Sequence, residues 1–414
     1  MQDKDTTKTT FFQLFQPVYQ GLFSQYIEET GVDKYVKKLT TMKLFQLLSF
    51  AQLEQFNGLR DISNSLNNED HSLSVELESI SHSQISRRLN SIPTSAFHVL
   101  FQDLVQQVGI KTGFEKIRNT LGNIYLIDSS TISLCLSRYR WAEFRKTKGG
   151  VKLHLRIRLF EQGVLPDHAE ITAAKPNDRT QMDNLIVEEK DAINIFDRGY
   201  IDYKKFDEYC EKGIRFVTRL KANATVAVQQ EFQLKPESLI KQDCIVILGG
   251  PQTRMEHPVR LIATADSEGN PITIVTNDLT IDAEELGELY RYRWQIEIFF
   301  KWLKQNLHVN HMYGLSKQAV ENQLYIALVT FCLLMIIKLT SGYDGPLLTV
   351  KRFLRVCLYD PIEAFLRKLN YKSKRTSRGR RRLDHEKVFQ HTLSQVIEGE
   401  VDFLDDLTYD PVIL

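Results

Sequence analysis

The segment from Tyr290 to Lys304 carries side chains that can bind phosphate and metal ions along one side of a helix. At about 100° per residue, five of these side chains fall within roughly 60° of one another on a single helix: Tyr290, Arg293, Glu297, Lys301 and Lys304. Apolar residues border this stripe on both sides, which predicts a polar seam in a cleft rather than a face open to water. The alternative is an ordinary helix in which Glu297 forms i,i+4 ion pairs with Arg293 and Lys301.

These residue types suit chemistry on a phosphodiester. An arginine guanidinium binds phosphate through two parallel hydrogen bonds, and a lysine adds a point charge. Tyr290 and Arg293, beside the carboxylate of Glu297, can therefore hold a DNA phosphate, and Lys304 adds charge farther along the stripe. For Lys301, which is closer to Glu297, the simple ion pair is the favoured interpretation.

Four of these residues also reproduce a named pattern. Tyrosine, two residues, arginine, three residues, glutamate, six residues and lysine is the Y-R-E-K signature, which here reads Tyr290, Arg293, Glu297 and Lys304. On this signature the chain resembles bacterial DDE-type insertion-sequence transposases of insertion sequence family four. In that family the glutamate is the last of three metal-binding acids, so the resemblance implies two earlier aspartates, each at the end of a buried strand.

Two aspartates meet this requirement. Asp128 ends the apolar run 123–127, and Asp197 ends the run 193–196. An aspartate at a strand end is by itself more often a turn former or a helix cap than a ligand. The sequence Asp-Arg-Gly-Tyr that starts at Asp197, however, resembles the second acidic motif of the family. Asp128, Asp197 and Glu297 are thus the candidate catalytic and metal-binding residues.

Three carboxylates suit a pair of divalent cations. Phosphodiester cleavage needs an activated oxygen nucleophile, a stabilised leaving oxygen and a neutralised phosphate, which two ions about 3.5–4 Å apart supply together. Hard Mg²⁺ or Mn²⁺ ions bind carboxylate oxygens and water. The chain has no Cys-x-x-Cys or His-Glu-x-x-His motif, which agrees with this choice of metal.

Residues from about 10 to 110 are predicted to be helical throughout, with a strong helix at 42–56. Two short helices, at 59–66 and 81–90, suggest a helix-turn-helix reader of DNA. The side chains expected to face DNA are Ser83, Gln84, Arg87 and Arg88. A plain helical bundle is the alternative. The resemblance favours DNA binding, because the N-terminal domains of the family are helical and bind the element ends.

A sheet is predicted for residues from about 120 to 220. The stretch 151–159 alternates strictly between apolar residues and Lys152, His154, Arg156 and Arg158. This basic face and the preceding loop at 146–150 form a candidate DNA surface that includes Lys148 and Lys152, although a merely solvated face fits the pattern too. A helix at 202–212 and a strand at 214–218 follow. Strand, hairpin, helix and strand with acids at strand ends resemble an RNase H-like fold.

Between Asp197 and Glu297 the pattern becomes all-β, with strands predicted at 244–248, 259–265 and 272–276. This stretch resembles the β-rich insertion that the family places inside its catalytic core. We therefore expect a separate β lobe over residues 221–280. The two aspartates are expected on adjacent parallel strands, with Glu297 on a helix packed over them.

Composition agrees with a globular protein of several domains, since 414 residues exceed what one core usually holds. The net charge of +1 conceals basic stretches at 138–158 and 367–382 and an acidic tail at 392–414, and such local fields decide DNA binding. The five scattered cysteines are typical of reduced cytosolic thiols. The apolar stretch 324–337 is shorter than the about 20 residues that cross a bilayer, which predicts a buried core helix.

These features together predict an α/β protein with an RNase H-like catalytic core, a β-rich insertion and an all-helical N-terminal DNA-binding domain. The expected divisions are 1–115 for the DNA-binding domain, 116–220 and 281–345 for the core, 221–280 for the insertion, and 346–414 for a helical and basic C-terminal region with the acidic tail.

The resemblance implies a cut-and-paste transposase that binds the terminal inverted repeats of its element and uses two Mg²⁺ or Mn²⁺ ions. It further implies a homodimer on double-stranded DNA, including target DNA, located in the bacterial cytoplasm at the nucleoid without membrane contact. One alternative is an RNase H-like nuclease or junction resolvase, and the other is a non-catalytic DNA-binding regulator derived from an element.

Overall fold

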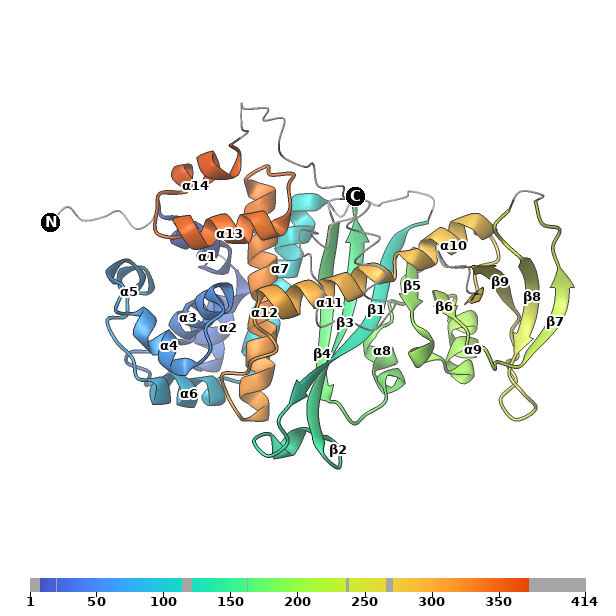
Figure 1. Ribbon diagram of the computed structural model, residues 1–414, viewed down its shortest axis with the longest axis horizontal. Coiled ribbons are helices and arrows are strands. Elements are labelled where there is room, and N and C mark those ends of the chain that lie inside the picture. The colour runs from blue at the N-terminus through green and yellow to red at the C-terminus, as the bar shows by residue number, and fades with distance from the viewer. Residues whose placement is uncertain are drawn as a thin grey trace, which may run out of the picture.

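The computed structural model describes residues 8–19, 21–113, 121–161, 163–235, 238–265 and 271–371. A helical part and a sheet lie side by side along the long axis of the molecule (Figure 1). Helices α10 (Ala283–Arg291) and α11 (Trp294–Asn306) run end to end across the sheet towards the helical part (Figure 1). The acidic tail, the part of the basic stretch beyond residue 371 and residues 266–270 lie outside the described residues.

The described N-terminal residues are helical, as the periodicity predicted. The helices are α1 (Thr10–Tyr19), α2 (Leu22–Thr30), α3 (Thr41–Glu54), α4 (Leu59–Ser65), α5 (Glu69–Val75), α6 (His82–Ser91) and α7 (Thr94–Thr112). Capping side chains define where they begin. Thr40 accepts a hydrogen bond from the backbone of Lys43, and Ser81 and Gln84 form a reciprocal capping box at α6. Helices α4 and α6 pack against each other.

Arg88 on α6 is turned inward. Its guanidinium forms an ion pair with Asp33 and donates hydrogen bonds to the backbone carbonyls of Val32 and Leu39. Asp33 in turn accepts from the backbone N–H of Thr41, where α3 begins. This corrects the outward orientation expected for Arg88, because its charge is used to join α6 to α3. Its neighbour Arg87 is exposed.

Replacing Arg88 with methionine is expected to lower the free energy of unfolding by about 3 kcal/mol, because the partly buried carboxylate of Asp33 loses its cation. Arg87→Met, on the exposed side of the same helix, should change stability by no more than about 0.5 kcal/mol. Urea denaturation of both variants measures the difference. Equal stability of the two would show that the ion pair is not structural.

The described strands form one continuous sheet in the order β2-β3-β1-β5-β6-β10-β9-β8-β7, with β4 paired to β3. Their bounds are β1 (Asn123–Leu134), β2 (Glu143–Arg145), β3 (Lys148–Phe160), β4 (Gly163–Ala173), β5 (Ala192–Phe196), β6 (Arg215–Arg219), β7 (Val226–Glu231), β8 (Gln242–Leu248), β9 (Val259–Ala265) and β10 (Pro271–Thr276). Strand β1 is antiparallel to β3 and parallel to β5, and β5 is parallel to β6.

The strands within residues 221–280 do not form a separate lobe. Strand β10 pairs antiparallel with β6, and β9, β8 and β7 continue from it in turn. The expectation of a separate β lobe is therefore wrong. The sheet positions were predicted, but their continuity with the core depends on the pairing of β10 with β6, which local sequence does not specify.

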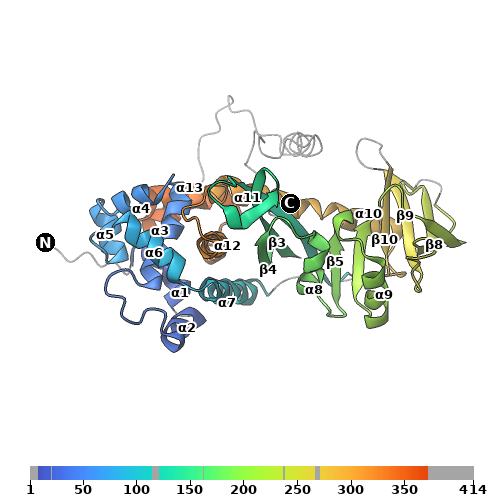
Figure 2. The same ribbon diagram turned by 90° about the horizontal axis from the view of Figure 1, so that it is seen from below.

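Helices cover both faces of the central strands (Figures 1 and 2). On one face, α11 packs on β1, while α7 and α12 (Lys317–Thr340) pack on β4. On the other, α8 (Met182–Leu185) and α9 (Tyr203–Lys212) share a second core with Ile127 and Phe196. Gly213, in the left-handed conformation with φ 70°, ends α9 where the sequence predicted.

Helix α12 contains the stretch predicted as a buried core helix. It is long and apolar enough to cross a membrane, but 89% of its apolar window is buried inside the protein. It packs on α7 and α3, with α13 (Leu347–Cys357) against it and α14 (Ile362–Leu369) beyond. Burial in the core thus accounts for its apolar composition. The five cysteines are all free, as expected.

Candidate active site

Parallel pairing brings the two aspartates together. Ile127 on β1 is the register partner of Phe196 on β5, so the residues that follow them, Asp128 and Asp197, occupy neighbouring positions. Side chains alternate between faces along a strand. The residues two positions before each aspartate belong to the core that includes α11. Both aspartates are therefore on the face of the sheet that α11 covers.

Asp128 lies within its strand and not at the end of it, contrary to the expectation from sequence. Strand β1 continues to Leu134 along β3, whereas β5 stops at Phe196. The carboxylate of Asp128 thus sits where the neighbouring strand ends. Its side chain is 19% exposed, and one carboxylate oxygen accepts the backbone N–H of Ser129 at 2.7 Å.

Arg293 contacts two of the candidate acids, Glu297 and Asp128. Nη1 of Arg293 lies 2.6 Å from Oε1 of Glu297 and 3.7 Å from Oδ2 of Asp128. The two carboxylate oxygens are therefore no farther apart than the sum of these distances. That separation is within the reach of a pair of metal ions about 3.5–4 Å apart. The i,i+4 ion pair of Arg293 with Glu297 is present, and Arg293 also forms an ion pair with Asp128.

The stripe from Tyr290 to Lys304 is carried by two helices, which corrects the single helix expected. The backbone N–H of Tyr292 donates a hydrogen bond to the carbonyl of Leu289 at 3.2 Å, and that of Arg293 donates one to the carbonyl of Tyr290 at 3.1 Å. Each acceptor is three residues earlier in the chain. This tightened turn separates α10 from α11. Tyr290 still contacts Arg293, because the guanidinium carbon lies 5.7 Å from the centre of its ring.

Burial dominates the electrostatics of these groups. It raises the pKa of Asp128 to about 7, with Arg293 opposing the shift and Glu297 and Asp197 adding to it. Burial also raises the pKa of Glu297, again opposed by Arg293 and supported by Asp197. For Arg293, burial disfavours the charge, but the surrounding acidic groups outweigh it and raise its pKa. The pKa values of Asp128 and Glu297 are thus both raised, and the charge of Asp197 adds to each shift while Arg293 opposes it.

The remaining residues of the stripe are also buried or half-buried. Tyr290 is buried, which raises the pKa of its hydroxyl to about 12. Lys301 is only 4% exposed, inside the helix packing, and Lys304 is half-buried farther along α11. The structure thus places all five predicted side chains on α10, α11 or the turn between them.

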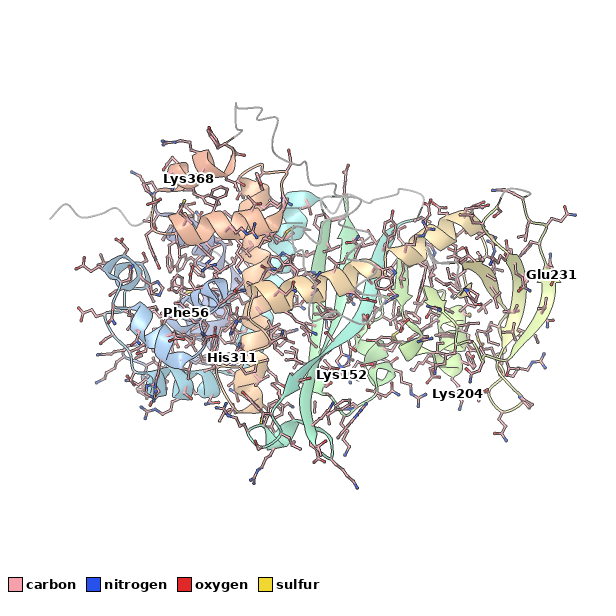
Figure 3. All side chains as sticks on the ribbon, in the orientation of Figure 1. Phe56, Lys152, Lys204, Glu231, His311 and Lys368 are labelled. Carbon is pink, nitrogen blue, oxygen red and sulfur yellow. The ribbon has the colours of Figure 1, made fainter. Side chains whose placement is uncertain are left out.

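Lys148 and Lys152 have different surroundings. Lys148 is exposed, near the tip of the β2–β3 hairpin, which projects beyond the rest of the sheet (Figure 1). Lys152, labelled in Figure 3, is 12% exposed and lies 2.8 Å from Asp178, on the face of β3 opposite the aspartates. The outward basic face expected for β3 is wrong at this position, because Asp178 neutralises Lys152.

Two residues near the acids were missed from sequence. Thr218 on β6 is the register partner of Phe196, so Arg219 lies beside Asp197 on the same face, and its charge acts on Tyr290. Its only sequence signal is its place at the end of a predicted strand. Asp178, on the opposite face, accepts a hydrogen bond from Oγ of Ser129 at 2.8 Å and thereby holds β1 next to Asp128.

The donor set suits a hard divalent cation, because it consists of carboxylate oxygens. Among the described residues, no three His, Cys, Asp or Glu side chains converge closely enough to hold an ion as they stand. The guanidinium of Arg293 lies between two of the acids, and its Nε has no hydrogen-bond partner in the described part of the chain. A cation at this place fits the charge, provided that Arg293 withdraws from Asp128.

The family described as "Transposase DDE domain" matches residues 119–334, a span that contains all three acids. The chain belongs to this transposase family. A second family, described as a domain of unknown function, matches residues 6–75 of the transposase. The transposase family implies dependence on a divalent metal ion.

Relatives of the transposase carry matching names. It is 25% identical over 334 residues to a probable transposase for insertion sequence element IS5377 of Geobacillus stearothermophilus, covering 79% of this chain and 84% of the relative. It is 29% identical over 276 residues to the putative transposase y4zB of Sinorhizobium fredii, covering 65% and 74%. A solved piggyBac transposase synaptic complex with hairpin DNA has a TM-score of 0.44 and 10% identity, covering 89% and 83%. The domain match and the two sequence relatives show that the chain is an insertion-sequence transposase, an enzyme of DNA cleavage and strand transfer.

The pKa of Asp128 leads to a pH-dependent stability. The folded pKa of about 7 exceeds the unfolded value of about 4. The stability that Asp128 contributes is therefore complete below pH 4 and is lost as the pH rises through 7, at roughly 1.4 kcal/mol per unit of pKa difference. In EDTA, Asp128→Asn should unfold at a higher temperature than wild type at pH 8. The difference between the two unfolding temperatures should be smaller at pH 5. Mg²⁺ should stabilise wild type more than the variant at pH 8. Identical pH profiles would contradict the assignment.

Proposed function

We propose that this transposase cleaves and joins DNA at the ends of its insertion sequence, with Asp128, Asp197 and Glu297 as the acids that hold two Mg²⁺ or Mn²⁺ ions. The observation that carries the proposal is their convergence on one face of the sheet, with one guanidinium between two of them. When bound, such ions activate the attacking oxygen and stabilise the leaving oxygen. The acids supply the negative charge that keeps the ions in place.

We further propose that the central strands form an RNase H-like core. The order β4-β3-β1-β5-β6, in which β1, β5 and β6 are parallel and β3 is antiparallel, supports this reading. In the proposed division, residues 1–115 bind DNA, 116–220 and 281–345 form the core, and 221–280 are an insertion that lengthens its sheet. Residues 346–414 form a C-terminal region.

The cations beside the acids suit the DNA backbone. Arg293 compensates the carboxylates, and once metal ions take over that compensation its guanidinium can bind a phosphate through two hydrogen bonds. Tyr290 lies against it, the charge of Arg219 acts on Tyr290, and Lys304 lies about two turns beyond Glu297 on α11. This is the role proposed for the Y-R-E-K residues. Lys301, buried in α11, has a supporting role in the packing of that helix.

The wider DNA surface combines the hairpin and the N-terminal helices. The exposed basic residues of the hairpin region are Arg138, Arg140, Arg145, Lys146 and Lys148. On α6, Ser83, Gln84 and Arg87 are exposed and can meet the terminal inverted repeats. Recognition of two element ends favours a homodimer on double-stranded DNA, in the cytoplasm at the nucleoid. Phosphate contacts position such a complex, and base contacts specify its sequence.

Asp197→Ala tests the catalytic proposal. The variant should lose cleavage of a plasmid that carries the coding region with its native flanking DNA, while its affinity for duplexes made from those flanks stays near that of wild type. The reason is that Asp197 lies at the strand end as a metal donor and makes no helix-capping hydrogen bond. Cleavage by Asp197→Ala at the wild-type rate would contradict the assignment of Asp197 as a catalytic acid. It would favour a DNA-binding protein whose acids have no catalytic role.

Lys148→Gln and Lys152→Gln form a matched pair for the DNA surface. Loss of one phosphate contact at Lys148 should reduce the slope of log affinity against log salt by roughly 0.9. Lys152→Gln should leave that slope unchanged, because Lys152 is already paired with Asp178. Affinity for the same duplexes at several salt concentrations measures both. Equal slopes for the two variants would show that Lys148 on the hairpin does not contact a DNA phosphate.

A further inference from the structure

The C-terminal end of α11 is held by two side chains from other segments. The backbone carbonyl of Gln305 accepts a hydrogen bond from Nε2 of Gln55, and that of Asn306 accepts one from Nζ of Lys351, both at 2.5 Å. Carbonyls in the last turn of a helix have no partner within the helix. Two such acceptors of α11 are thus satisfied from outside.

The two donors come from parts of the chain far apart in sequence. Gln55 ends α3 in the left-handed conformation, with φ 58°, and Lys351 lies on α13. A bidentate ion pair joins these parts, because Arg355 on α13 donates to the two carboxylate oxygens of Glu54 at 3.0 and 2.9 Å. Helices α3, α11 and α13 therefore meet at one junction.

The loop after α11 is held at the same place. The hydroxyl of Tyr313 donates to the carbonyl of Phe56 at 3.0 Å, next to Gln55. Phe56 and His311, labelled in Figure 3, mark where the end of α3 and this loop meet on the helical side of the molecule. The junction thus holds both the C-terminal end of α11 and the loop that follows it.

Lys351 is a costly residue for this position. Its side chain is part of the buried core at 3% exposure. Burial lowers its pKa to about 8, which Arg355 and Arg352 reinforce and Glu54 opposes, and His308 lies within electrostatic range. A buried ammonium persists where hydrogen bonds compensate its desolvation, and a helix C-terminus also favours a cation. A methionine would fill similar space without this cost, so the donor has a purpose beyond packing.

At its other end, α11 contacts β1, and Arg293 links Glu297 to Asp128. Arg293 precedes the helix without a side-chain cap, and the tightened turn joins it to α10. Glu297 lies in the first turn of a helix of 13 residues, which is about 20 Å long. Because a helix of this length moves as a rod, a shift at its C-terminal end displaces Glu297 relative to Asp128.

We propose that Lys351 and Gln55 are positioning residues for DNA cleavage, which hold the last-turn carbonyls of α11 and so fix Glu297 against Asp128. The inference rests on the proposed role of Glu297. A displacement of about 1 Å in an active site lowers the rate on the order of 100-fold. DNA affinity does not depend on this alignment and stays unchanged.

The test compares Lys351→Met, Lys351→Arg and the control Lys338→Met, which removes a similarly buried lysine from α12. The substrate is the plasmid with the coding region and its native flanks, with Mg²⁺ and enzyme in excess. Lys351→Met should cleave about 10- to 100-fold more slowly than the control, with affinity for the flank duplexes within about 3-fold. Lys351→Arg, which keeps a charged donor, should recover most of the rate.

Cleavage by Lys351→Met at the rate of the control, or no recovery with arginine, would overturn the proposal. If Lys351→Met does not fold, Gln55→Met decides, because it removes the donor to the neighbouring carbonyl. A normal cleavage rate for a folded Gln55→Met then refutes the junction as a positioning device. An inactive Asp197→Ala beside a fully active Lys351→Met would refute this inference alone and leave the catalytic acids in place.

Discussion

The interaction on which the site depends is the contact of one guanidinium with two carboxylates. Asp128 and Glu297 are brought into a place where burial raises the pKa of each, and like charges there repel strongly. Arg293 lies between them and offsets that repulsion in the absence of metal. A transposase must keep acids close enough to share ions while remaining folded without them. An arginine in the turn directly before the helix that carries the last acid meets both requirements, because it is held next to Glu297 and, in the proposed function, turns towards phosphate.

The rest of the fold serves to keep these groups in register. Parallel pairing of β1 with β5 places two acids side by side, and antiparallel pairing with β3 carries β1 onward into the projecting hairpin. Helix α11 crosses above them and ends against α3 and α13 (Figure 1). Two of the candidate acids thus come from the sheet, whereas the side chains that contact the end of the helix carrying the third acid belong to the helical part.

Sequence specified much of this arrangement, because its signals were local. Strand periodicity located β1, β5 and β6, capping residues located α9, and spacing located Tyr290, Arg293 and Glu297. What remained hidden depended on partners distant in the chain. Whether Arg88 faces DNA is decided by Asp33, whether Lys152 is free is decided by Asp178, and the continuity of the sheet is decided by the pairing of β10 with β6. The break before Arg293 was missed because a tightened turn preserves the helical stripe almost unchanged.

The position of Asp128 inside β1 also limits how the element can change over generations. A slip of one residue against β3 would turn Ser129 towards α11 and Asp128 towards Asp178, which places two carboxylates together where a hydroxyl now donates. Extra residues at the tip of the β2–β3 hairpin leave this register untouched. A single inserted residue before Asp128 inverts it locally while most of the sheet and the N-terminal helices persist. If the proposed roles of the acids and of the N-terminal helices hold, such a copy would occupy element ends without cutting them and would compete with the active copies from which it arose.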